Sequence, residues 1–316
     1  FTPKYMEMVS PVSEPTGIEE SSELDSIRTS DRVVANPQIS EPLSERDQKT
    51  NAYKPPSSLQ SPEKLLNINT SLYSTTLSSF YGGSFVSFKF NQYFKKDSQF
   101  VDIIRNQENL LIKGKDLDGN TLPLDGFWEL VSHEKGVSQR VVYRKELYSK
   151  EFIYKTFVFH DDSYVIDLEV DLQGISNNIY RNSELAWSGG LSSTEENVDD
   201  DIYYFNSYAL QGGELESLKV GSGESEETTL NGITDWAAIR TKYFAVAIIP
   251  GNTKSISSVT LSGAGDTTEV YGMSFVFDPL EKQSFQLYMG PLEYDRVRTL
   301  GVALESIMDF GWSFIR

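Results

Sequence analysis

Apolar and polar residues alternate along the second part of the chain. The clearest stretch is 164–172, where one set of alternate positions is apolar and the other acidic: Tyr164, Ile166, Leu168, Val170 and Leu172 against Asp167, Glu169 and Asp171. A period of two is typical of a strand with one face in the core and one in water. Further strands are predicted around residues 86–90, 152–159, 243–249, 256–261, 271–277 and 285–289.

Short polar turns separate these predicted strands. They contain glycine, aspartate or asparagine, as in Gly82-Gly83, Asp118-Gly119-Asn120, His160-Asp161-Asp162, Gly212-Gly213, Pro250-Gly251-Asn252 and Gly263-Ala264-Gly265-Asp266. No helical pattern lies between them, so we expect antiparallel sheets packed face to face. The pattern therefore predicts an all-β fold and argues against an α/β nucleotide-binding fold.

One segment near the end has a different period. Between Glu293 and Met308 the apolar residues fall at spacings of three and four: Val297, Leu300, Leu304, Ile307 and Met308. This spacing predicts a C-terminal α-helix with one apolar face. Gly290-Pro291 precedes it, Gly311 follows it, and the last residues are aromatic.

The first 66 residues have another composition. They hold 8 of the 12 prolines and only three aromatic residues, Phe1, Tyr5 and Tyr53. Such a stretch lacks the apolar area that offsets the entropy of ordering. The sequence therefore predicts a flexible polar linker at 1–66, a β-domain at 67–291, and a C-terminal helix with the start of a membrane-proximal segment at 292–316.

Charge excludes one class of partner. The net charge is −18, whereas nucleic-acid binding needs a concentrated basic face. The same sign disfavours attraction to anionic lipid headgroups. The chain has no cysteine, which excludes disulfides and thiolate metal sites. It has no apolar run of 18 residues, and its first residues do not show the basic region followed by an apolar stretch of a signal peptide.

Few residues are candidates for a catalytic, metal-binding or phosphate-binding site. His133 and His160 both lie in predicted polar turns, and neither belongs to a recognisable catalytic group. An acidic cluster lacks the ligand spacing of a calcium loop, so we expect a solvated surface loop: Glu195, Glu196, Asp199, Asp200 and Asp201. Gly221-Ser222-Gly223 and Gly263-Ala264-Gly265 lack the context of a phosphate loop and are interpreted as turns. We expect no catalytic residue, no metal and no cofactor.

Two tryptophans leave an alternative open. Exposed, Trp187 and Trp236 could line a groove for an extended peptide or a carbohydrate. Trp236 is interpreted as core, because buried tryptophan is usual in a sandwich. For Trp187 the sequence does not distinguish between an exposed and a buried position.

Several ordered blocks resemble a known family. They are YGGSFVSFKF (81–90), KTFVFHDDSYVIDLEV (155–170), WAAIRTKYFAVAIIP (236–250), LYMGP (287–291) and DFGWSFIR (309–316). In this order they are similar to the large periplasmic domain of the YidC insertases, members of the YidC/Oxa/Alb family. The last two blocks carry the most specific resemblance, and residues 1–66 match nothing in it.

The resemblance implies an antiparallel supersandwich related to galactose mutarotases. It also implies a non-catalytic module of a bacterial inner membrane insertase or chaperone, placed in the periplasm, that assists insertion and folding of membrane proteins. The implied partners are the membrane-embedded core of the same protein, components of the Sec translocon and nascent membrane proteins. The alternative is an exported carbohydrate-binding or mutarotase-like protein.

The C-terminal helix is the best functional candidate in this interpretation. It would couple the domain to the membrane part or face a partner through Glu293, Arg296, Leu300, Leu304 and Trp312. Charged residues on its outer side would include Asp295, Arg298 and Glu305. The competing interpretation is that its apolar face packs on the domain's own sheet.

Overall fold

The fold was derived from a computed structural model that describes residues 62–265 and 269–308. Within these ranges the chain forms eighteen strands and five short helical turns, and every strand pair is antiparallel. The all-β antiparallel prediction is therefore confirmed. The helical turns are η1 (Gln173–Ile175), α1 (Val198–Ile202), η2 (Thr253–Ser255), α2 (Tyr294–Arg298) and η3 (Leu304–Ile307).

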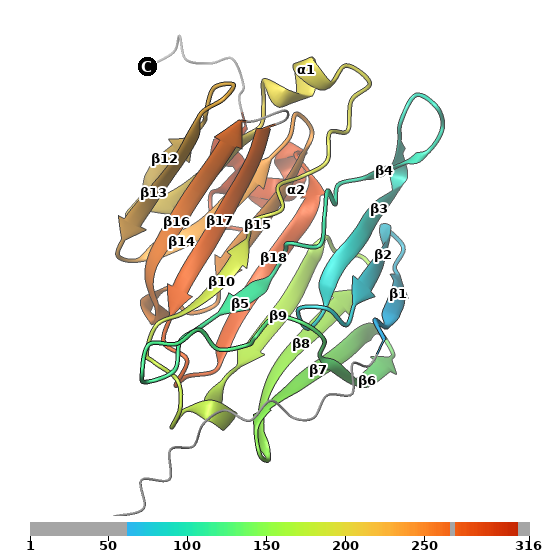
Figure 1. Cartoon of the computed structure of the whole chain (residues 1–316). Helices are drawn as coiled ribbons and strands as arrows, with labels where there is room; N and C mark the ends of the chain where they lie inside the picture. Colours follow the sequence, from blue (N-terminus) through green and yellow to red (C-terminus); the bar gives the residue numbers. More distant parts are fainter. Residues whose placement is uncertain (1–61, 266–268, 309–316) are drawn as a thin grey trace, which may run out of the picture. The chain divides into compact units, whose positions relative to one another are not determined.

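The strands form three sheets (Figure 1). The first sheet has the order β1 (Leu65–Asn69), β2 (Tyr73–Ser78), β3 (Ser84–Phe94), β4 (Phe100–Asp102). The second has the order β13 (Ser225–Asn231), β16 (Ile256–Gly265), β17 (Glu269–Phe277), β10 (Ser183–Trp187), β5 (Leu111–Lys113). The third has the order β12 (Glu214–Leu218), β11 (Asn206–Gln211), β14 (Thr234–Arg240), β15 (Phe244–Pro250), β18 (Gln283–Pro291), β9 (Val165–Asp171), β8 (Glu151–His160), β7 (Ser138–Tyr148), β6 (Glu129–Lys135).

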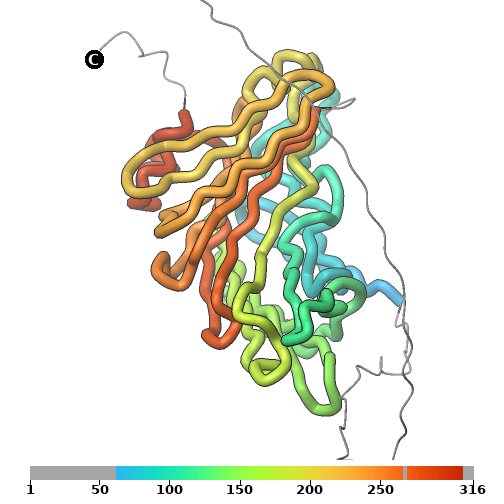
Figure 2. Tube along the Cα trace, turned by 60° about the vertical axis from the view of Figure 1, so that its left-hand side comes forward, coloured from blue at the N-terminus to red at the C-terminus, as the bar shows by residue number. Residues whose placement is uncertain are grey.

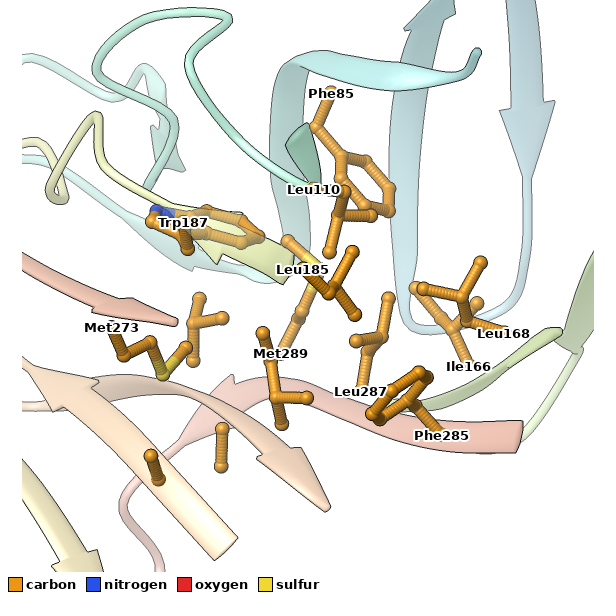
Figure 3. Packing of buried hydrophobic residues seen from close by; sticks show 14 of the residues in the cluster. Phe85, Leu110, Ile166, Leu168, Leu185, Trp187, Met273, Phe285, Leu287 and Met289 are labelled. Carbon is orange, nitrogen blue, oxygen red and sulfur yellow. The ribbon is translucent and has the colours of Figure 1, made fainter. Parts of the chain in front are cut away.

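Both smaller sheets cover the same face of the nine-stranded sheet. Phe157, Leu168 and Phe285 are direct neighbours across β8, β9 and β18, so their side chains share one face. On that face Phe157 packs edge-on against Phe85 of β3, and Phe285 lies 6.3 Å, centroid to centroid, from Phe275 of β17. The result is a supersandwich with one continuous apolar core, part of which is shown in Figure 3.

The double glycine before β3 is required by this packing. Gly82 and Gly83 both have positive φ, and an added Cβ would come within 2.6 Å of Trp128 at Gly82 and of Phe157 at Gly83. A side chain at either position would strain this backbone and collide with the neighbouring ring. The turn therefore lets the first sheet close onto the core of the third.

Three local expectations need correction. Gly263, Ala264 and Gly265 belong to β16 and not to a turn. Glycine serves close packing here, since an added Cβ at Gly263 would meet Leu218 at 2.8 Å. His133 lies in β6, an edge strand whose mixed polar residues resembled a turn. Strand β1 begins at Leu65, one residue before the expected end of the linker at 66. The rest of that linker, residues 1–61, lies outside the described residues.

Candidate functional site

The C-terminal segment lies on the other face of the nine-stranded sheet. Side chains alternate along β14, so Trp236 points away from Ala237, which shares the core face with Ile248 and Leu287. The Trp236 indole donates a hydrogen bond of 2.7 Å to the Val302 carbonyl. Figure 2 shows this last segment, in red, beside the strands of that sheet.

The segment forms two short turns instead of the single helix predicted from Glu293 to Met308. Helix α2 ends near Thr299, and the turn η3 begins after Ala303. Gly301 has φ +72° and Ala303 has φ +58°, both in the left-handed region that interrupts a right-handed helix. The spacing of apolar residues was correct for burial but could not reveal the break, because both turns present their apolar residues to the same sheet.

The apolar face of the segment is part of the core. Val297 and Leu304 are fully buried, and Ile307 is 3% exposed. Leu304 was a candidate for a partner-facing or membrane-coupling role, and in the structure its side chain is buried in the core of the domain. Leu300 is half-buried at the edge of this contact. Trp312, the remaining apolar candidate, lies outside the described residues.

Two of the charged candidates hold α2 onto the sandwich. Glu293 accepts a hydrogen bond from the Tyr93 hydroxyl of β3 through one carboxylate oxygen and from Arg296 Nε, at 3.1 Å, through the other. The Arg296 guanidinium lies 5.0 Å from the ring centroid of Tyr164. The hydrogen bond from Tyr93, followed by Arg296, lowers the pKa of the Glu293 carboxyl. Both side chains are partly exposed to solvent. Through Tyr93 they connect α2 to the β3 hairpin.

A buried arginine fixes the end of the segment. Arg240, the last residue of β14, is 5% exposed. Its guanidinium donates hydrogen bonds to the carbonyls of Thr241, Lys242 and Ile307. Arg240 was not among the residues predicted from the sequence to be functional. The signal that could have found it is the alternation of β14, which puts Arg240 on the same face as Trp236.

The acidic cluster is only partly solvated. Asp201 of α1 is fully buried and accepts hydrogen bonds from the backbone N–H groups of Thr194, at 2.6 Å, and Lys242, at 2.9 Å. The expectation of a solvated loop is therefore wrong for Asp201, which ties this loop to the turn between β14 and β15. No group of metal-ligating side chains is found in the part of the chain that the structure describes.

The histidines and tryptophans have structural surroundings. His160 Nε2 lies 2.8 Å from Asp167 on the neighbouring strand, and His133 Nε2 lies 3.1 Å from Gln139. Trp187 and Trp236 are both buried, so the interpretation of Trp236 as core is confirmed and the open question about Trp187 is decided the same way. Figure 3 shows Trp187 beside Phe85 in the core.

A shallow groove of about 670 Å³ follows the edge strand β5. Its lining is mostly apolar, and the ion pair between Lys113 and Glu184, at 3.0 Å, crosses the β5–β10 contact beside it. Neither tryptophan discussed above lines it. Among the described residues no helix is long and apolar enough to cross a bilayer.

Comparison with known proteins places this geometry in a family. The model of the YidC periplasmic domain matches residues 65–316, which include every described strand and the C-terminal segment. The chain belongs to this family. It is similar to the membrane protein insertase YidC of Prosthecochloris aestuarii, with 30% identity over 274 residues, covering 80% of this chain and 46% of that protein. It is also similar to YidC of Chlorobium phaeovibrioides, with 36% identity over 186 residues, covering 56% of this chain and 32% of that protein.

The chain therefore spans about half the length of the curated YidC relatives that it matches over most of its own length. Among solved structures it is similar to an α-N-acetylgalactosaminidase of Bifidobacterium bifidum in complex with GalNAc, with a TM-score of 0.48, 12% identity, and coverage of 76% of this chain and 39% of that one. The resemblance to the YidC family stated from the sequence blocks is confirmed.

Proposed function

We propose that this chain is the non-catalytic periplasmic module of a membrane protein insertase of the bacterial inner membrane. In this role it assists insertion and folding of inner membrane proteins, alone or beside the Sec translocon. Its first partner is the membrane-embedded core of the same protein, and Sec components and nascent membrane proteins are further partners.

The observation that supports this role is how the C-terminal segment is held. Glu293 joins it to β3, Arg240 binds the Ile307 carbonyl, and Trp236 binds the Val302 carbonyl. One contact is to the first sheet and two are to β14 of the nine-stranded sheet, and together they fix the segment's position. The backbone is thus held in place as far as η3, which suits a module that couples to a membrane part.

Within this proposal the candidate residues divide by position. Leu304 anchors the segment in the core, whereas Leu300, Glu293 and Arg296 form its outer edge and are the residues proposed to meet a partner. Trp312 follows in the membrane-proximal segment. The half-buried Leu300 is the most useful probe. A substitution there changes the outer edge of the C-terminal segment and disturbs the core less than a substitution at the fully buried Leu304.

The test is a chimera in which residues 65–316 replace the matching segment of the Prosthecochloris aestuarii insertase. We expect Leu300→Asp to leave the domain folded and to lower insertion of a membrane protein substrate several-fold, measured by protease protection. The matched control is Val131→Asp, since Val131 is an exposed apolar residue on the distant edge strand β6. Insertion at the unmodified level by folded Leu300→Asp would contradict the proposal.

A further inference from the structure

The turn between β3 and β4 carries an exposed pair of aromatic rings. Phe94 and Phe100 are partners in the β3–β4 register, and their ring centroids are 4.9 Å apart. Phe94 is 56% exposed and Phe100 is 47% exposed, so their contact with each other leaves about half of each residue in solvent. Single exposed apolar side chains are normal at a protein surface, whereas two in contact form a small apolar patch, a feature that interaction sites share.

The turn itself is ordered by backbone hydrogen bonds. Lys95 N–H donates to the Gln99 carbonyl at 2.7 Å, and Ser98 N–H donates to the Lys95 carbonyl at 2.9 Å. The tip therefore presents the two rings in a fixed arrangement, with Lys95 and Lys96 next to them in the sequence.

Contacts connect this tip to the C-terminal segment. Lys96 forms an ion pair of 2.8 Å with Glu196, in the loop before α1. Asp201 of α1 binds the backbone of Lys242, and Arg240, two residues earlier, binds the Ile307 carbonyl. The tip, α1, the β14–β15 turn and η3 thus belong to one end of the domain, the upper end in Figure 1.

Other exposed aromatic residues at this end lie beside basic side chains. Tyr203 is 70% exposed and has the Lys219 ammonium 4.9 Å from its ring centroid. Tyr243 is 49% exposed, with the Lys242 ammonium at 5.1 Å. Tyr294 is 40% exposed and lies on α2 next to Arg298. Aromatic rings paired with lysine or arginine are the residue types that gather at the boundary between lipid and water.

The sequence beyond Met308 has the same character. It reads Asp309-Phe310-Gly311-Trp312-Ser313-Phe314-Ile315-Arg316. In the sequence these residues come directly after Met308, and Arg240 holds the Ile307 carbonyl at this end of the domain.

We propose that this end of the domain, here named the aromatic end and defined by Phe94, Phe100, Tyr203, Tyr243 and Tyr294, rests in the headgroup region of a phospholipid bilayer. The β3–β4 turn is the deepest point. This lipid contact goes beyond the protein partners of the proposed function. The same end carries Glu195, Glu196, Asp199 and Asp200, so ring burial drives the contact, and neutral phosphatidylcholine is sufficient.

A fluorophore at the tip tests the geometry. The chain has no cysteine, so Ser98→Cys gives a unique site for an NBD label at the turn. With phosphatidylcholine vesicles we expect a shift of its emission to shorter wavelength and quenching by lipids with a nitroxide headgroup. The control label is at Ser149→Cys, an exposed position in the β7–β8 turn at the opposite end of the strands (Figure 1), where emission should not change.

Matched variants test the contribution of the rings. We expect Phe94→Ser with Phe100→Ser to lower the fraction of the chain that floats with phosphatidylcholine vesicles at least fivefold. Leu117→Ser removes an apolar side chain that is 65% exposed in another loop and should leave flotation unchanged. Phosphatidylglycerol added to the vesicles should not increase the floating fraction.

Three results would overturn the inference: equal flotation of the double variant and the unmodified chain, equal spectral shifts of both labels, or binding only when phosphatidylglycerol is present. The first would mean that the rings of Phe94 and Phe100 do not hold the chain on lipid. These assays contain lipid only, so their outcome is independent of the insertion assay that tests the proposed function.

Discussion

Lys155 is a fully buried amine in the middle of the core. It lies on β8 between Ile153 and Phe157, on the face that points into the sandwich. Its ammonium donates hydrogen bonds to the carbonyls of Tyr81 and Leu110, whose φ values are both positive, and lies 5.5 Å from the Trp128 ring centroid. Burial lowers the pKa of Lys155 to about 7. The side chain therefore links the turn before β3 to the nine-stranded sheet at the cost of desolvating a charge.

This lowered pKa predicts a dependence of stability on pH. The unfolded chain keeps the Lys155 proton up to its ordinary pKa of 10.5, whereas the folded chain releases it near pH 7. The unfolded state therefore binds more protons in this window, so the contribution of Lys155 to stability rises as pH increases from about 7 to 10.5 and is constant below 7.

Lys155→Met should remove that rise, because methionine keeps most of the volume but has no titratable group. We expect the difference in unfolding free energy between pH 6.5 and pH 9.5, measured by urea denaturation, to be smaller in the variant. Lys89→Met, at an exposed position on β3, is the control. An unchanged difference in Lys155→Met would show that the charge of the amine does not affect folding.

The hydrogen bond between Tyr93 and Glu293 predicts a second pH effect of the same sign, in the acidic range. The pKa of Glu293 is lowered in the folded state, so the bond contributes stability above the ordinary carboxyl range and loses it as pH falls through the lowered pKa. A double-mutant cycle of Tyr93→Phe and Glu293→Gln should give a coupling of about 1 kcal/mol at pH 7. The coupling should decrease towards pH 3, and a constant value would contradict this anchor for α2.

At the scale of elements, the C-terminal segment shows what periodicity can predict. Spacings of three and four placed Val297, Leu304 and Ile307 on one apolar face, and all three are buried in the structure. They did not reveal that the backbone turns to the left-handed region at Gly301 and Ala303. Apolar spacing records which side chains face the sheet, and two separate turns can satisfy it as well as one helix.

The two leucines of this segment should differ in their effect on stability. Leu304→Ala should destabilise the chain by about 2–5 kcal/mol, because it removes a fully buried side chain and leaves a cavity. Leu300→Ala should cost about 1 kcal/mol or less, since the side chain is only half-buried. Urea denaturation measures both. A smaller cost for Leu304 than for Leu300 would mean that η3 does not pack as described.

Strands were predicted better than the polar contacts between them. Period-two alternation predicted β3, β9, β17 and β18, because each has one face in the core and this is recorded locally. Strand β8 was predicted from its apolar run at 152–159. Alternation along β8 places Lys155 on the core face, a signal that was not used in the prediction. The burial of Asp201 had no such local signal. It depends on backbone groups of Thr194 and Lys242, and the latter is far away in the sequence.

At the scale of the molecule, the two smaller sheets pack on the same face of the nine-stranded sheet. Phe85 and Phe275 come from different small sheets, and both pack on the face of the nine-stranded sheet that carries Phe157 and Phe285. The order of strands in these sheets could not be predicted from the sequence. Strand β5, for example, pairs with β10 more than 70 positions later, and such long-range pairing leaves no pattern in either strand.

The shared face predicts cooperative unfolding of the described domain. We expect Phe157→Ala and Phe275→Ala to lower the midpoint of a single urea transition, with tryptophan fluorescence and far-ultraviolet circular dichroism coinciding in both variants. The exposed control Phe127→Ala, which removes a side chain that is 36% exposed, should shift the midpoint less. Separate transitions for the two signals would mean that the small sheets unfold independently.

The hydrogen bonds from Trp236 and Arg240 to the C-terminal backbone have a mechanical consequence. Tension on the chain beyond Met308 is transmitted first to β14, inside the nine-stranded sheet, because the carbonyls of Val302 and Ile307 are bound there. Strand β18, which directly precedes the segment, is thereby shielded from being peeled away. The Trp236 and Arg240 side chains therefore distribute a force on the C-terminus to the middle of the nine-stranded sheet.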